Sequence, residues 1–186
     1  MTTEIKNQPA NPAPLGLLGF GMTTILLNLH NAGIISLSSI IIAMGFAMGG
    51  LAQVIAGIVG YKNGQTFCAT AFTAYGLFWW SLILILVNPF TGMEAADGAG
   101  MGFYLLLWAV FTAFMFVGTL KHDVASRLVF GSLAILFVLL SIGNFSGIAA
   151  VKTAAGWEGI VCGCFAVYSS LAQVLNGEYG RKVLPL

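Results

Sequence analysis

Long apolar runs separated by short polar segments make up most of this 186-residue sequence. A helix needs roughly 20 apolar residues to cross the hydrocarbon core of a bilayer. The pattern predicts six such helices, at residues 15–32, 35–61, 66–88, 101–120, 126–147 and 157–176. The runs are continuous and do not alternate between apolar and polar residues, so the pattern favours helices over the strands of a transmembrane barrel.

The composition agrees with burial in lipid. Hydrophobic residues make up 59% of the chain and charged residues only 7%, whereas about a quarter of the residues of a soluble domain are charged. We therefore predict an all-α integral membrane protein, a six-helix bundle over 15–176 between a cytoplasmic N-terminal segment, 1–14, and a cytoplasmic tail, 177–186. The N-terminal segment is polar and lacks the apolar core of a cleavable signal peptide.

The distribution of cations predicts the orientation. Lys and Arg concentrate in the cytoplasmic loops of membrane proteins. With the N-terminus inside, six of the seven Lys and Arg residues fall in cytoplasmic segments and only Lys152 falls outside. The six are Lys6, Lys62, Lys121, Arg127, Arg181 and Lys182. We expect a multi-pass protein of the plasma or inner membrane with both termini in the cytoplasm.

The end of the second predicted helix recurs at the end of the sixth. The segments 51–62 and 171–182 share seven of twelve residues, and both begin Leu-Ala-Gln-Val. Both would run from outside to inside, which predicts a parallel repeat of three helical hairpins. Chance similarity in a biased composition is the alternative.

Two helix faces carry the polar residues that face a pore in our interpretation. Residues spaced by three or four positions share one face of a helix. On the first helix these are Phe20, Thr24, Asn28 and Asn31, and on the fifth they are Leu133, Phe137, Leu140 and Asn144. Each face has a bulky apolar residue deep in the helix and an amide toward the outer end. This predicts a hydrophobic constriction below a polar vestibule, unless the amides only bond one helix to another.

Other polar residues in the spans allow two interpretations each. Gln53 and its counterpart Gln173 suit either helix contacts or a pore lining. Tyr75 needs a partner for its hydroxyl, and its ring would narrow a passage. Small residues at four-residue spacing, including Gly45, Gly49, Gly159 and Gly163, predict close contacts between helices.

The ionisable residues bear on the mechanism. Apart from Arg127 at the inner end of the span 126–147, the predicted spans contain no Lys, Arg or Asp, and His30 and Glu158 lie near the outer ends of their spans. A proton-driven carrier often keeps a carboxylate or histidine relay in the bilayer, so the pattern favours a channel. His30 suits either a pH sensor or an interfacial hydrogen bond, and Glu158 suits stabilisation of a helix N-terminus.

Several classes of function find no support in the sequence. It has no nucleophile paired with a base, no cluster of metal ligands and no phosphate-binding loop, so we expect neither an enzyme nor a bound cofactor or metal. Its net charge of +1 gives no reason to expect nucleic acid as a partner. The expected partners are the lipid bilayer, further copies of the chain and a small solute.

The segment just before the first helix resembles the signature of the acetate uptake transporter family, the GPR1/FUN34/YaaH-type membrane proteins. That family includes bacterial succinate-acetate permeases and yeast ammonia-export homologues. The signature residues are Asn11, Pro12, Ala13, Pro14, Leu15, Gly16 and Leu17. Similar segments at 72–76, 116–121, 142–144 and 180–185 extend the resemblance over nearly the whole chain.

The resemblance implies six helices per subunit, a homohexamer with one pore in each subunit, and passage of acetate and, in some members, succinate. By the same resemblance, the constriction falls on Phe20, Tyr75 and Leu133. Polar positions of the substrate path correspond to Thr24, Asn28, Gln53 and Asn144. The chain departs from the bacterial permeases at Glu158, where an apolar residue is usual, and at Gly60, where an acidic residue occurs.

These observations favour channel-like transport of acetate or a related small carboxylate through a narrow, uncharged pore. Neutral donors bind an anion weakly enough for conduction, whereas a lysine or arginine would hold it tightly. Three alternatives remain: a proton-acetate symporter, an ammonium or urea channel, and a sensor that binds acetate without transport. The sequence leaves open the physiological carboxylate and the direction of flux.

Overall fold

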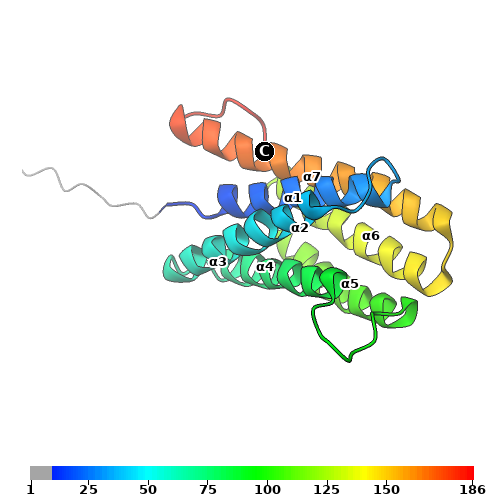
Figure 1. Cartoon of the computed structure of the whole chain (residues 1–186). Helices are drawn as coiled ribbons and strands as arrows, with labels where there is room; N and C mark the ends of the chain where they lie inside the picture. Colours follow the sequence, from blue (N-terminus) through cyan, green and yellow to red (C-terminus); the bar gives the residue numbers. More distant parts are fainter. Residues whose placement is uncertain (1–9) are drawn as a thin grey trace, which may run out of the picture.

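The chain folds into helices joined by short loops, as the computed structural model shows for residues 10–186 (Figure 1). The helices are α1 (Ala13–Asn31), α2 (Ser39–Met44), η1 (Gly45–Ala52), α3 (Gln53–Lys62), α4 (Thr66–Val87), α5 (Gly98–Thr119), α6 (Val124–Ser146) and α7 (Ala149–Glu178). Because α2, η1 and α3 form one continuous span, six helices of residues 10–186 are long and apolar enough to cross a membrane. This confirms the all-α class with six spans. Of the predicted N-terminal segment, residues 1–9 lie outside the described residues.

The predicted start of the sixth helix at residue 157 is wrong, because α7 begins at Ala149. The hydropathy pattern ended at the polar pair Lys152 and Thr153, but the alanines around this pair are strong helix formers. Glu158 therefore lies in the third turn of α7. The helix dipole acts mainly within the first turn, so Glu158 does not stabilise the N-terminus of this helix.

The second span also differs from its prediction. It begins at Ser39 instead of residue 35, and its middle, Gly45–Ala52, is a π-helix. The wider π turn is rare and changes which backbone carbonyls bond within the helix. Side chains from neighbouring helices donate to two carbonyls of this region: Trp80 Nε1 to the Phe46 oxygen at 3.1 Å and Thr23 Oγ1 to the Met44 oxygen at 3.3 Å.

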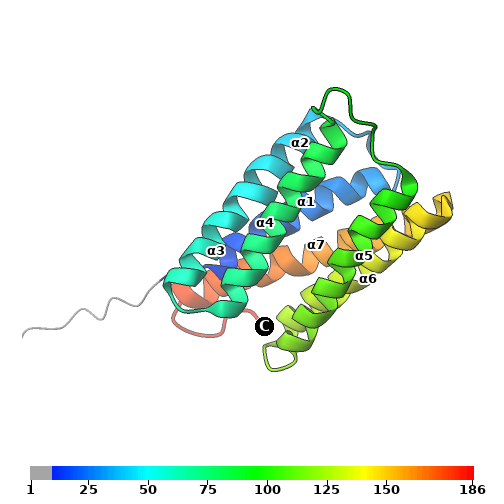
Figure 2. The same cartoon turned by 90° about the horizontal axis from the view of Figure 1, so that it is seen from below.

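The helices form a closed ring in chain order. The span α2–α3 packs against α1 and α4, α5 packs against α6, and α7 packs against α6 and α1. Between α4 and α5 the contact is made by aromatic side chains, with the Phe78 and Tyr104 rings 5.8 Å apart and the Tyr75 and Trp108 rings 6.1 Å apart. Figure 2 shows the pairs α3–α4 and α5–α6, with α1 and α7 behind them.

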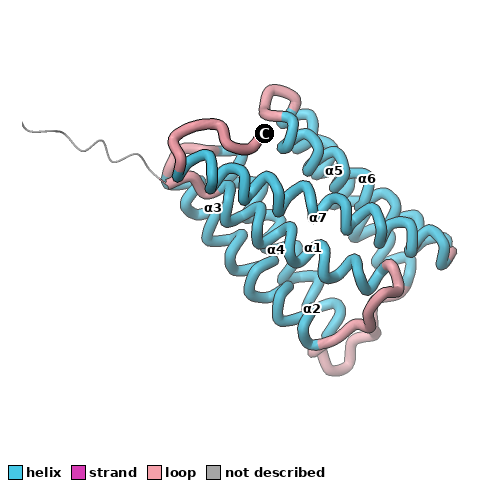
Figure 3. Tube along the Cα trace, turned by 90° about the horizontal axis from the view of Figure 1, so that it is seen from above, coloured by secondary structure: helices cyan, strands magenta, loops and turns pink. Residues whose placement is uncertain are grey.

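Close backbone contact between α1 and α7 closes the ring (Figure 3). A Cβ atom built on Gly21 would lie 2.8 Å from the carbonyl oxygen of Gly163, and one built on Gly163 would lie 2.8 Å from the carbonyl oxygen of Gly21. Gly159 lies against the side chain of Asn28 in the same way. The predicted close contact at Gly159 and Gly163 is thus confirmed, within a single chain.

The outer surface of the ring is apolar. On α5, the side chains of Phe103, Leu107 and Phe114 are 62%, 72% and 76% exposed. Continuous apolar surface of this kind marks contact with lipid or with another protein, because exposure to water would be unfavourable. The fold therefore has a lipid-compatible exterior and places its buried polar groups inside.

The contact between α1 and α7 gives a stability prediction. We expect Gly21→Ala to lower the free energy of unfolding by about 1–3 kcal/mol, because the methyl group forces the two backbones apart. Gly177→Ala is the matched control, since a Cβ atom there meets nothing within 4 Å. Thermal unfolding in detergent should show a lower Tm for Gly21→Ala only; equal Tm values for the two variants would contradict the tight contact.

Candidate functional site: a cavity and its constriction

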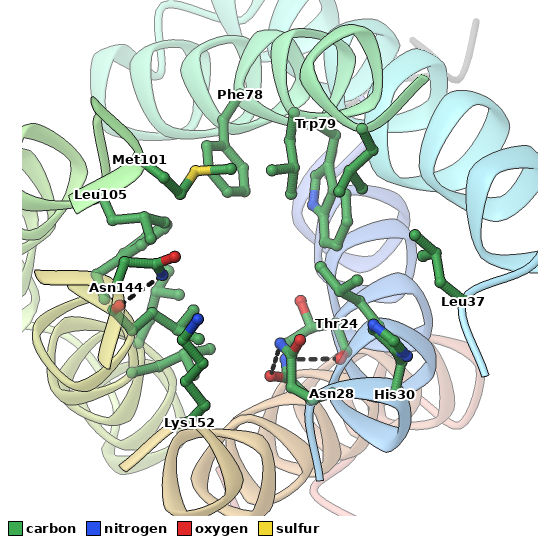
Figure 4. Close-up of a pocket in the computed structure, with 18 of the residues that line it drawn as sticks. Thr24, Asn28, His30, Leu37, Phe78, Trp79, Met101, Leu105, Asn144 and Lys152 are labelled. Atoms are coloured by element: carbon green, nitrogen blue, oxygen red, sulfur yellow. Dashed lines mark hydrogen bonds between the residues drawn. The ribbon is translucent and has the colours of Figure 1, made fainter. Parts of the chain in front are cut away.

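A cavity of about 370 Å³ occupies the interior of the ring (Figure 4). Both helix faces singled out from the sequence line it. These are Phe20, Thr24, Asn28 and Asn31 of α1, and Leu133, Phe137, Leu140 and Asn144 of α6. Further walls come from α4, α5 and the start of α7. They include Phe78, Trp79, Leu82, Leu86, Met101, Leu105 and Lys152.

A second, much smaller cavity of about 10 Å³ lies on the other side of Phe20 and Leu133. These two residues line both cavities and are only 5% and 2% exposed, respectively. Tyr75, Gln53 and Phe130 are among the residues around the small cavity. The space inside the ring thus narrows at Phe20 and Leu133.

Tyr75 contributes its ring to this narrow region. Its ring centroid is 6.2 Å from that of Phe20 and 6.1 Å from that of Phe130. Its hydroxyl lies 2.9 Å from Thr112 Oγ1 of α5, and both residues are buried. The hydroxyl therefore has a partner in the protein, and the ring borders the small cavity.

The amides of the large cavity bond within their own helices. Asn28 Nδ2 donates to the Thr24 carbonyl at 2.9 Å, and Asn31 Nδ2 donates to Asn28 Oδ1 at 2.9 Å. Asn144 Nδ2 donates to the Leu140 carbonyl at 2.8 Å. None of these bonds joins two helices. The alternative interpretation, in which these amides only connect one helix to another, is therefore not supported. Because an amide carries two N–H donors, each Nδ2 keeps a second N–H that these bonds do not use.

Gln53 is fully buried next to the small cavity. Its Nε2 donates to the Gly49 carbonyl at 2.7 Å, while its Oε1 has no partner. Its counterpart Gln173 has different surroundings, because Gln173 Oε1 accepts a bond of 3.0 Å from Asn11 Nδ2. The similar sequence segments thus place one glutamine beside the interior cavity and the other against the signature segment.

Two basic residues lie where the large cavity opens, Lys152 of α7 and His30 of α1. Lys152 was predicted in an outer loop, but Figure 4 shows its ammonium group pointing toward the cavity. His30 Nδ1 lies 3.2 Å from the Ile35 carbonyl and donates to it, because a carbonyl only accepts. Glu158 does not line the cavity and is half-buried.

The comparisons with known proteins agree with this architecture. The model of the GPR1/FUN34/yaaH family matches residues 1–184. The chain belongs to the GPR1/FUN34/yaaH family. The succinate-acetate/proton symporter SatP of Escherichia coli K12 is 56% identical, with 95% of each chain covered. Acetate permease A of Emericella nidulans is 34% identical over 95% of this chain and 65% of its own length.

A solved structure described as the bacterial acetate channel SatP matches with a TM-score of 0.94 and 54% identity. The match covers 96% of this chain and 99% of that one. Together with the six apolar spans, these relatives identify this family member as a multi-pass protein of the inner membrane. The family is one of transporters and channels.

The family signature has a structural role in this fold. Asn11 Oδ1 accepts a bond of 3.0 Å from the Ala13 N–H at the start of α1, and its Nδ2 reaches Gln173 of α7. Ser170 Oγ of α7 donates to the Pro14 carbonyl at 2.6 Å. The signature therefore fixes the start of α1 against the end of α7.

Sequence reasoning missed two notable residues of the large cavity. Trp79 follows Tyr75 by four positions and so shares its face of α4, a spacing that would have predicted its place. Lys152 was missed because it was placed in a loop. The alanines that flank it predict helix, and in the first turn of α7 a long side chain reaches the mouth of the cavity.

Proposed function

We propose that this protein conducts acetate, and other small monocarboxylates or succinate, across the membrane. The proposal rests chiefly on the two cavities inside one subunit, which meet at the buried pair Phe20 and Leu133. The names of the E. coli, Emericella and solved relatives, which specify acetate or succinate, support the substrate class.

Phe20, Tyr75 and Leu133 form the constriction in this proposal. Their apolar surfaces exclude wide or strongly hydrated solutes, and such a constriction can close by losing its water. Acetate passes because its methyl group is compatible with these side chains. Its carboxylate must shed only part of its hydration if polar groups lie on either side.

Thr24, Asn28, Gln53 and Asn144 provide those polar groups along the path. An unpaired carboxylate in an apolar environment is strongly unfavourable, so it needs hydrogen-bond donors throughout the passage. The hydroxyl and amide N–H groups of these residues are neutral donors. Binding is therefore weak, which allows release and conduction.

Two further features of the proposal concern topology and assembly. Lys62 ends α3, Arg127 lies in the first turn of α6 and Arg181 follows the end of α7, so we place this side and both termini in the cytoplasm. We also propose a homohexamer, which the family resemblance implies, with one path per subunit, because side chains of one chain line the whole cavity. A native mass spectrum dominated by any other oligomer would reject the hexamer.

Proton-coupled symport is the second candidate, because the E. coli relative is named a proton symporter. In residues 10–186, the large cavity has two ionisable lining residues, His30 and Lys152. In a symporter, the imidazole of His30 would be the group of this cavity that binds a transported proton. Channel and symporter differ in whether acetate accumulates when a pH gradient is imposed.

Uptake of labelled acetate into proteoliposomes tests the function. We expect saturation only at high acetate concentration, uptake that responds to membrane voltage, and no dependence on a pH gradient when the voltage is clamped. Uptake that follows the pH gradient while the voltage is clamped would favour the symporter over the channel. Acetate uptake no greater than that of empty liposomes in every condition would reject both the channel and the symporter. Uptake of labelled ammonium into the same vesicles tests the alternative of an ammonium channel.

Widening the constriction should change selectivity. We expect Phe20→Ala and Leu133→Ala to raise the flux of butyrate relative to acetate at least fivefold, because each removes a large apolar group from the narrowest point. Leu140→Ala is the matched control, since Leu140 lines only the large cavity. Unchanged flux ratios in both constriction variants would remove these residues from the selectivity filter.

Lys152 should attract anions to the mouth of the cavity. We expect Lys152→Gln to raise the KM for acetate several-fold at low ionic strength and to leave the maximal rate unchanged. The difference should shrink at 0.5 M salt, because salt screens charges near the surface. Lys121→Gln, at the other end of the bundle, is the control. A KM for Lys152→Gln that equals that of the wild type at low salt would contradict this role.

A further inference from the structure

A second ring of apolar side chains lies next to the constriction, on the side of the chain termini. The three constriction residues belong to α1, α4 and α6, and these helices all begin at the end of the bundle where both termini lie (Figure 2). On each helix another bulky apolar residue stands three positions earlier. These residues, the inner ring, are Leu17, Phe72 and Phe130. Residues three apart share a helix face and differ in height by about 4.5 Å, so the two rings are stacked.

The small cavity lies between the two rings. Its lining consists of the three constriction residues, the three residues of the inner ring, Gln53 and Val129. Leu17, Phe72 and Phe130 are only 7%, 6% and 7% exposed. Their packing leaves no room for a hydrated solute to reach the small cavity from the side of the termini. The inner ring is therefore a second apolar closure of the space inside the bundle.

Phe72 is held in the inner ring by close packing on the backbone of α1. A Cβ atom built on Gly16 would overlap the Phe72 ring, so the absence of a side chain at this position lets the ring lie directly against α1. Leu17 follows Gly16 in the same turn of that helix. These two members of the ring can move only if α1 and α4 separate.

Phe130 is held differently, by a row of aromatic side chains. Its ring centroid lies 5.2 Å from that of Phe67, in the first turn of α4. The Phe67 centroid lies 4.9 Å from that of His122, which is exposed in the loop between α5 and α6. Both contacts are edge-to-face, an arrangement that aromatic rings favour. The row thus connects the inner ring to a loop at the surface.

The difference in packing makes Phe130 the movable member of the inner ring. Phe67 is only partly buried, and His122 is exposed. A shift of these two side chains gives the Phe130 ring room to turn away from Leu17 and Phe72, and no helix has to move. Such a turn would join the small cavity to the side of the termini.

We propose that Leu17, Phe72 and Phe130 form an inner gate, and that Phe67 and His122 hold Phe130 in the closed position. The gate rests on the proposed function, because a solute that has passed the constriction meets the inner ring next. Phe130 contacts the path itself, whereas Phe67 and His122 are positioning residues. The constriction selects the solute, and the inner gate opens or closes the path on the side of the termini.

Labelling of a thiol between the two rings tests the gate without measuring transport. Cys68, Cys162 and Cys164 are replaced by alanine, and Val129→Cys then places a single thiol in the wall of the small cavity. A charged methanethiosulfonate cannot cross the bilayer, so from the side of the termini it reaches this thiol only through the gate. Membrane vesicles of both orientations are compared, and Arg181→Cys, in the exposed tail, identifies the orientation that presents the termini.

Substitutions in the gate should speed this labelling from the side of the termini. We expect Phe130→Ala to raise the rate about tenfold or more, and Phe67→Ala or His122→Ala to raise it about twofold to tenfold, the size of one aromatic contact. His122→Phe should label at the rate of the parent, because it restores an aromatic ring. Phe116→Ala is the matched control and should also label at that rate, since Phe116 packs on Gly131 of α6 and lines neither cavity.

Two results would overturn the gate: a thiol at Val129 that labels as fast as the tail thiol with all gate residues in place, or equal rates in Phe130→Ala and Phe116→Ala. Equal rates in His122→Ala and His122→Phe would remove the positioning role of His122. Circular dichroism and the elution volume of each variant establish that it is folded. Gated labelling of a protein that passes no acetate would reject the proposed transport and leave the gate standing, and acetate flux with ungated labelling would do the reverse.

Discussion

The close approach of α1 and α7 is the contact on which the interior of this protein depends. Gly21 and Gly163 bring the two backbones together, which closes the ring of helices at the junction of its first and last members. In lipid the hydrophobic effect does not draw helices together, so tight packing of small residues must do so. Without this contact, the cavity between α1 and α6 would be open to the bilayer.

The same contact sets the rotation of α1. Gly21 faces α7, while Gly19 lies close to Met48 of the π-helix, so the helix is held on two sides. The third side carries Phe20 and Thr24, and it faces inward as a consequence. One helix therefore supplies both an apolar residue of the constriction and a polar residue of the proposed path, at fixed heights one turn apart.

The π-helix has a comparable effect on the opposite wall. Its glycines accept the rings of Trp79 and Trp80, and its Phe46 carbonyl binds only the second of them. Two adjacent indoles thus serve different purposes, one holding helices together and one facing the cavity. In our proposal, neutral donors in the cavity wall and basic side chains at the mouth attract a small anion and bind it weakly.

The sequence by itself determined the six spans, the family and the inward faces of α1 and α6, because hydropathy, a contiguous signature and helical periodicity are local properties of the chain. Only the tertiary structure decided that Gln53 and Gln173 have different surroundings, that Trp80 bonds the π-helix while Trp79 lines the cavity, and that Lys152 lies at the cavity mouth. These features depend on which atoms of other helices come within hydrogen-bonding distance, and on a π-helix and an extended α7 that hydropathy does not register.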